Sequence, residues 1–164
     1  LTRRSHGDGR PIARVPWREV QTLRDVLALN RYVAAQDGVH ENALAELRNG
    51  RKRTHWMWFV FPQIAGLGSS AMARRYAIGS LAEARAYLAH PLLGQRLLAC
   101  TRAANAWEDR SAHDLFGLPD DMKFRSSMTL FARADPEAPD FARALATFFG
   151  GQPDPLTLER LSER

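Results

Sequence analysis

The sequence predicts one all-α domain of about seven to nine short helices, with no substantial β-sheet. Three observations support this prediction: apolar residues recur at helical spacing along most of the chain, capping and breaking residues separate these stretches, and no two strand-like segments are available to pair. The length of 164 residues is that of one ordinary domain, and 45% hydrophobic with 25% charged residues is a typical globular composition.

The first two helices are marked by apolar faces and by glycine stops. One is expected from Val26 to Asp37-Gly38, with Asp25 as its candidate N-cap, and the next from about Val39 to Asn49-Gly50. Their apolar faces contain Val26, Leu29, Tyr32 and Val33 in the first and Ala43, Leu44 and Leu47 in the second. Spacings of three and four residues are typical of an amphipathic helix.

Capping residues mark the helices in the middle of the chain. Ser80 with Glu83 predicts a capping box, in which each side chain satisfies a backbone N–H of the other residue. His90-Pro91 starts the longest periodic stretch, because proline is tolerated at the first helical position. The apolar side of this stretch contains Leu93, Leu97, Cys100 and Ala104. We therefore expect Cys100 to be an inert core thiol rather than a nucleophile.

The C-terminal third shows equally clear boundaries. Ser111 with Asp114 predicts another cap, and Gly117 predicts the stop of that helix. Three further helices are expected over residues 120–134, 139–149 and 155–161. Asp135-Pro136 and Gly150-Gly151 separate them. In the first of the three, helical spacing brings together Phe124, Met128 and Phe131.

One aromatic segment, residues 54–61 (THWMWFVF), fits either a buried strand or a buried helix. We expect a helix, because a strand without a partner would leave its backbone groups unsatisfied. The following residues 66–70 (GLGSS) lack the Gly-Lys of a phosphate-binding P-loop. We expect a connector there, with Ser69 or Ser70 as a helix cap.

Composition limits the compartment and the partners. The longest apolar run, residues 56–62, is too short for a membrane span, no signal peptide is apparent, and the single cysteine cannot form an internal disulfide, so we expect a cytoplasmic protein. Residues 1–25 hold six arginines against three acidic residues, which is +3 of the net charge of +5 and leaves +2 on the body. We expect a flexible arginine-rich leader, and the nearly balanced body counts against nucleic-acid binding.

The run of residues 50–63 (GRKRTHWMWFVFPQ), with Gly66-Leu67-Gly68 after it, resembles the signature of the DUF1810 family, a bacterial domain of unknown function. Further stretches agree in order: Ala35-Gln36, residues 83–88, residues 90–94, Phe116-Gly117, Asp121, Lys123, residues 125–131, Gly150-Gly151 and Asp154-Pro155. The resemblance covers about residues 26–164 and leaves residues 1–25 outside. It implies a single all-helical domain and brings no established reaction, cofactor or catalytic residue.

Two blocks of the sequence mix polar and aromatic residues densely. The first block consists of Arg51, Lys52, Arg53, His55, Trp56, Trp58 and Gln63. It predicts a pocket if the tryptophans stack on a planar ligand, His55 acts as a catalytic base, and the cations hold phosphate or carboxylate. The alternative is a buried amphipathic segment, with the tryptophans filling the core, that follows a solvated basic turn.

The second block consists of Asp121, Lys123, Arg125, Ser126, Ser127 and Thr129. Helical spacing places Lys123 on the same face as both serines. Lys123 would activate a serine as a nucleophile if burial lowered its pKa, or it would bind the anionic end of a ligand together with the hydroxyls. The structural alternative is a solvated lysine, with the serines at a close helix contact. A pocket between the two blocks is our sharpest expectation.

These features favour a helical domain that binds a small anionic or nucleotide-like ligand, either as a binding protein or as an enzyme. A protein–protein adaptor is the first alternative, and it requires an exposed apolar patch. Weak nucleic-acid binding through the leader and the basic residues Arg48, Arg51, Lys52 and Arg53 is the second. No cofactor is identified, and the histidines His40, His90 and His113 show no metal-ligand spacing. Asp109 and His113 are spaced as a helical surface pair.

Overall fold

The computed structural model describes residues 23–163, which form ten α-helices and no strand. The helices are α1 (Leu23–Gln36), α2 (His40–Arg48), α3 (Met57–Val60), α4 (Ala71–Arg75), α5 (Leu81–Ala89), α6 (Leu93–Asn105), α7 (Ala112–Phe116), α8 (Asp120–Ala134), α9 (Pro139–Phe149) and α10 (Pro155–Ser162). Seven of these ten described helices have at least seven residues, which confirms the predicted all-α fold. The expected leader falls mostly on residues 1–22, outside the described part of the chain.

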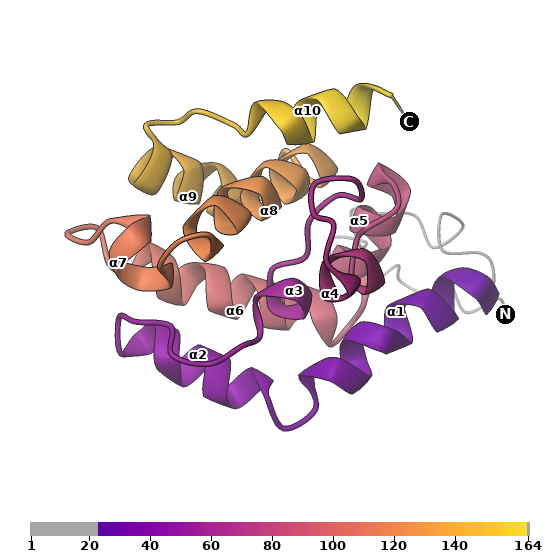
Figure 1. The fold of residues 1–164 in the computed structure, drawn as a ribbon, viewed down its shortest axis with the longest axis horizontal. Coiled ribbons are helices and arrows are strands. Elements are labelled where there is room, and N and C mark those ends of the chain that lie inside the picture. Colours follow the sequence, from indigo (N-terminus) through magenta and orange to yellow (C-terminus); the bar gives the residue numbers. More distant parts are fainter. Residues whose placement is uncertain (1–22, 164) are drawn as a thin grey trace, which may run out of the picture.

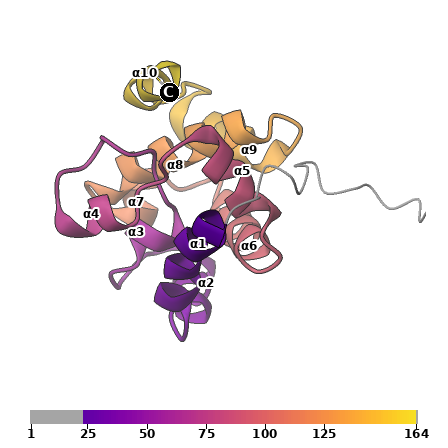
Figure 2. The same cartoon turned by 90° about the vertical axis from the view of Figure 1, so that its right-hand side faces the viewer.

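Helices α5, α6, α8 and α9 form the centre of the molecule, with α2 packed along α6 and α10 packed on α8 (Figure 1). The short helices α3, α4 and α7 lie on one face of this assembly, as the turned view shows (Figure 2). Buried aromatic side chains fill the interior; Phe124 lies 4.5 Å from Phe116 and 5.1 Å from Phe61, measured between ring centroids. None of the described helices is both long enough and apolar enough to span a membrane.

Most predicted boundaries are confirmed. Helices α8 and α9 cover the predicted ranges, α2 ends before Asn49-Gly50, and Ser70 caps α4 by accepting a hydrogen bond from the backbone N–H of Ala73. The capping box of Ser111 and Asp114 is present at the start of α7, and Gly117 ends that helix with a φ of 71°. Local backbone chemistry therefore determines most of the helix ends.

Three details of the prediction were wrong. Helix α1 begins at Leu23, so Asp25 lies inside the helix and is not its N-cap. Helix α6 begins at Leu93, because the imidazole of His90 accepts hydrogen bonds from the N–H groups of Leu92 and Leu93, and Pro91 lies in the preceding turn. At α5, Ser80 accepts from the N–H of Glu83, but the Glu83 carboxylate binds Gly79 and Arg31 instead of closing a capping box.

The helix expected over residues 54–61 is only one turn long, α3. Before it, the N–H groups of Arg53 and Thr54 donate to the carboxylate of Glu46 and are not used in a helix. After it, Ile64 forms an isolated parallel bridge with Ile78. The backbone of this segment is therefore hydrogen-bonded to the Glu46 carboxylate before α3 and is bridged to Ile78 after it. Neither partner is signalled by a local sequence pattern.

Candidate functional site

A buried carboxylate organises the first block. Glu46 on α2 is 6% exposed. Its carboxylate accepts hydrogen bonds from the N–H groups of Arg53 and Thr54, from the Thr54 hydroxyl at 2.6 Å and from the indole of Trp56 at 3.2 Å. Burial raises the pKa of Glu46, but these hydrogen bonds outweigh it, so the pKa lies below the ordinary value. Glu46 therefore fixes the path of the segment that leads into α3.

Sequence reasoning missed Glu46, although a signal was present. Position 46 follows Ala43 by three residues and precedes Leu47, so it lies on the apolar stripe of α2. A glutamate on such a stripe is buried with α2 and needs hydrogen-bond donors there.

The two tryptophans of the first block have different environments. Trp56 is fully buried in the core, 6.1 Å from the ring of Phe61 between centroids, which matches the core-filling alternative. Trp58 is only half-buried and keeps part of its ring accessible. His55 and Arg53 are exposed beside them.

Asp120, in the first turn of α8, joins the two blocks. Its carboxylate lies 2.9 Å from the ammonium of Lys52 and 3.5 Å from that of Lys123. Lys52 in turn lies 5.1 Å from the ring centroid of Trp56, and Lys123 lies 5.4 Å from that of Trp58. The blocks therefore meet in space, through a lysine–aspartate–lysine bridge above two indole rings.

The other members of the second block turn toward the C-terminal segment. Arg125 donates to the carbonyls of Gln152 and Pro153, and Ser126 donates to the carboxylate of Asp154 at 2.9 Å. Thr129 accepts from the N–H of the same aspartate. These side chains hold residues 152–154 on α8, which places α10.

Neither serine is hydrogen-bonded to Lys123 among the described contacts. Ser126 donates to Asp154 and to the Met122 carbonyl, whereas Lys123 pairs with Asp120. Ser127 is fully buried, and its hydroxyl has no hydrogen-bond partner within the described residues. Within the described residues, the structure therefore shows no hydrogen-bonded pair of Lys123 with either serine.

A pocket of about 540 Å³ lies between the segment before α3 and helix α7. We call it the basic pocket, and its lining residues are Arg51, Lys52, Arg110, His113, Asp114, Leu115, Phe116 and Gly117. Three permanent cations face one carboxylate in this lining. Of the residues in the two predicted blocks, Arg51 and Lys52 belong to it, and Arg110 and His113 are additions that no local motif signals.

Two of the cations in the basic pocket are held in place. Arg110 lies 4.7 Å from the ring centroid of Trp107 and donates to the carbonyl of Gly50 at 3.0 Å. Lys52 is held by Asp120 and by its own backbone N–H, which donates to the carbonyl of Leu115 at 2.6 Å. The positive charge of this pocket is therefore pre-positioned by the fold.

The remaining charged groups of the basic pocket are more exposed. Arg51 is exposed, and its guanidinium forms no ion pair within the described residues. His113 lies 3.6 Å from Asp121 and is therefore placed beside a different aspartate from the expected Asp109. Asp114 is engaged in the cap of α7.

A second, smaller hollow of about 100 Å³ lies beside α3 and α4. We call it the Trp58 pocket, and it is lined by Trp58, Gln63, residues 64–68, Ala73, Arg74, Tyr76 and Ala77. Backbone approaches closely here, because a Cβ on Gly68 would lie 2.7 Å from that of Ala73. Two predicted candidates, Trp58 and Gln63, thus share one cavity.

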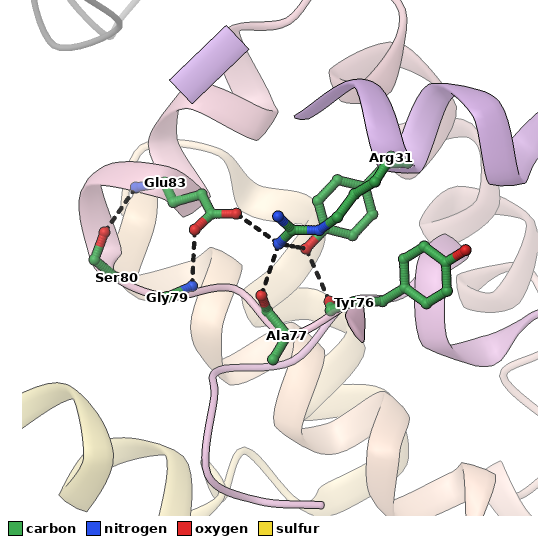
Figure 3. Close-up of polar contacts among 7 residues, drawn as sticks. Arg31, Tyr76, Ala77, Gly79, Ser80 and Glu83 are labelled. Carbon is green, nitrogen blue, oxygen red and sulfur yellow. Dashed lines mark hydrogen bonds and ion pairs between the residues drawn. The ribbon is translucent and has the colours of Figure 1, made fainter. Parts of the chain in front are cut away.

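The far wall of the Trp58 pocket is held from behind by α1 and α5 (Figure 3). Arg31 donates to the carbonyl of Ala77 at 2.8 Å and pairs with Glu83 at 2.9 Å, and Tyr32 donates to the carbonyl of Tyr76 at 2.8 Å. On the near side, Ile78 donates to the carbonyl of Gln63 at 2.8 Å. Both ends of the pocket-lining loop are therefore fixed.

The single cysteine is in the core. Cys100 is fully buried, and burial raises the pKa of its thiol to about 12, so the thiol is protonated near neutral pH. Its sulfur lies 3.9 Å from Nδ1 of His40, whose pKa is lowered by burial and by Arg96. Across residues 23–163 no group of three or more His, Cys, Asp or Glu side chains is arranged to hold a metal ion.

Comparison with known proteins gives a family and a structural relative. Residues 26–161 match the family described as "Protein of unknown function (DUF1810)". A solved structure, of the conserved hypothetical protein Rv1873 from Mycobacterium tuberculosis, is 54% identical with a TM-score of 0.80, and the match covers 82% of this chain and 96% of that one. A search of curated proteins found no match.

Proposed function

The chain belongs to the DUF1810 family, and we propose that it binds a small anionic ligand, bearing phosphate or carboxylate, in the basic pocket. The observation that carries this proposal is the convergence of Arg51, Lys52 and Arg110 on one cavity of about 540 Å³. Cavities of roughly 300–1,000 Å³ are typical of small-molecule sites. Guanidinium groups are well suited to phosphate and carboxylate, because they donate two parallel hydrogen bonds.

Pre-positioning supports the same proposal. Contacts within the protein already hold the side chains of Lys52 and Arg110. These two side chains therefore lose little conformational entropy when a ligand binds. Arg51 has no competing ion pair within the described residues and is free to contact an anion.

The adaptor alternative draws less support from the surface. Among the residues whose burial the structure describes, the large exposed apolar side chains are Leu27, Leu92, Leu118, Met122 and Leu156. They belong to separate elements, and only Leu118 and Met122 are near neighbours in the sequence. An adaptor would need a contiguous apolar patch.

The proposal is tested by titrating the protein with inorganic pyrophosphate at constant ionic strength, while the thermal midpoint and the heat of binding are recorded. Binding at a hundred times Kd adds about 2.7 kcal/mol, which is roughly 5–10 °C for a domain of this size. Arg51→Ala should weaken binding by about ten-fold or more, through the loss of a charged hydrogen bond.

Arg53→Ala is the matched control. It removes the same charge from an exposed position two residues away that does not line the basic pocket. Equal losses in both variants would show a general effect of charge and contradict the proposed site. The absence of any binding of pyrophosphate would contradict it directly.

A further inference from the structure

We infer that the Trp58 pocket binds the ring of the same ligand, so that the ligand class is a single heteroaromatic ring joined through a sugar to an anionic group. This inference rests on the proposed function, because the anionic group is assigned to the basic pocket. The Trp58 pocket then provides the contact residues for the ring of the ligand, as the basic pocket does for its anionic group.

The two pockets lie on the same side of the molecule. Residues 51–52 and α7 line the basic pocket, and α3 and α4 adjoin the Trp58 pocket. These short helices share one face of the fold (Figure 2). Lys52 lines the first pocket, Trp58 lines the second, and the bridge through Asp120 and Lys123 connects these two residues in steps of 2.9, 3.5 and 5.4 Å. A ligand that occupies both pockets has to span this bridge between the Lys52 ammonium and the Trp58 ring.

The lining of the Trp58 pocket defines the kind of ring. Trp58 and Tyr76 provide aromatic surface, and Ile64, Leu67 and Ala73 provide apolar walls. The lining also contains Gln63, whose side-chain amide makes no hydrogen bond within the described residues. An amide offers two donors and an acceptor, which complement the carbonyl or amide edge of a pyrimidine or a pyridine carboxamide.

The size of the Trp58 pocket restricts the ring further. Its volume is about 100 Å³. For comparison, an apolar cavity of about 150 Å³ admits benzene. A single six-membered ring, partly inserted, suits this space better than the fused rings of a purine. On the far wall, Arg31 and Tyr32 hold the backbone carbonyls of Ala77 and Tyr76 in place (Figure 3).

The test compares ligands that share an anionic end and differ in the ring. The full chain is titrated calorimetrically with ribose 5-phosphate, uridine monophosphate, nicotinamide mononucleotide and adenosine monophosphate. At least one of the two monocyclic nucleotides should bind about ten-fold more tightly than ribose 5-phosphate, since one good hydrogen bond or ring stack corresponds to that factor. Adenosine monophosphate should gain less.

Gln63→Ala should remove the gain from the ring and leave the affinity for ribose 5-phosphate unchanged. Gln95→Ala, at an exposed position on α6, is the matched control. Equal affinities for ribose 5-phosphate and both monocyclic nucleotides would overturn the ring site while the anion site stands. A larger gain for adenosine monophosphate would overturn the single-ring class. If no sugar phosphate binds and Arg51→Ala changes nothing, the proposed function and this inference both fail.

Discussion

The ammonium of Lys123 on α8 lies 5.4 Å from the ring centroid of Trp58 on α3. This contact joins the two blocks described above, because Trp58 belongs to the first and Lys123, which is 65 positions later in the sequence, belongs to the second. It also places a cation beside Trp58, which lines the Trp58 pocket, and next to the Asp120 carboxylate that holds Lys52. The candidate site is thus a tertiary arrangement of α3, α7 and α8.

The contact between Lys123 and Trp58 should be measurable as a coupling energy. We expect Lys123→Ala to cost about 0.5–1 kcal/mol, because the lysine is partly exposed and water screens its charge. In a double-mutant cycle with Trp58→Leu, which removes the aromatic ring, urea unfolding should give a coupling energy of the order of 0.5 kcal/mol. Arg133→Ala, exposed in the last turn of α8, is the control and should show no coupling. Zero coupling for Lys123 would contradict the contact.

Glu46 should make the fold sensitive to acid. Its pKa is below the ordinary value in the folded protein, so its contribution to stability is complete above the unfolded pKa and is lost as the pH falls through the folded pKa. Glu46→Ala should cost about 3 kcal/mol at neutral pH, since it leaves the backbone N–H groups of Arg53 and Thr54 and the buried indole N–H of Trp56 without this acceptor.

The measurement is urea unfolding of Glu46→Gln and the native chain between neutral and acidic pH. The variant should be less stable at neutral pH, and the difference should shrink as the pH falls through the range below the ordinary glutamate pKa. Glu41→Gln, at an exposed position on the same helix, is the control. If the difference in unfolding free energy between the native chain and Glu46→Gln is the same at all pH values, these contacts do not lower the pKa of the Glu46 carboxylate.

Two neighbouring serines should respond oppositely to removal of the hydroxyl. Ser126→Ala loses the hydrogen bond to Asp154, the aspartate that also caps α10, and should cost about 1–2 kcal/mol. Ser127→Ala removes a buried hydroxyl that has no partner within the described residues, and should be neutral or slightly stabilising. Thermal unfolding of the pair measures both. A large loss in Ser127→Ala would indicate an unseen partner for that hydroxyl, such as a bound water.

The fold could be predicted because its boundaries depend on local chemistry. Asp135-Pro136 and Gly150-Gly151 cannot continue a helix, and Ser111 with Asp114 satisfies the backbone at a helix start, so each signal acts within a few residues. Periodicity also predicted the buried faces of α6 and α8 correctly.

The candidate site could be predicted only in part. A pocket between the two blocks was an expectation that no local pattern could establish. Asp120 joins the blocks through a contact with Lys52 across 68 positions, Glu46 contacts Trp56 across 10 positions, and Arg110 contacts Gly50 across 60 positions. The hydrophobic periodicity of the sequence contains no information about such contacts between distant residues. The helix expected over residues 54–61 was shortened for the same reason, because the carboxylate of Glu46 competes for the backbone N–H groups.

Gly50 should be required for both the fold and the basic pocket. Its φ of 79° is in the left-handed region, and an added Cβ would lie 2.9 Å from the ring of Trp107 and 3.2 Å from the guanidinium of Arg110. Gly38 is the matched control, because its φ is 70° but an added Cβ would meet nothing within 4 Å. We expect Gly38→Ala to cost about 1 kcal/mol through backbone strain alone.

Gly50→Ala should cost about twice that or more, because strain and steric displacement add. It should also weaken pyrophosphate binding, since Trp107 and Arg110 must move and the Arg110 guanidinium loses its hydrogen bond to the Gly50 carbonyl. Urea unfolding and calorimetry on both variants separate the two effects. Gly38→Ala should bind pyrophosphate as the native chain does. Unchanged binding in a folded Gly50→Ala variant would show that the position of Arg110 does not determine the affinity of the basic pocket.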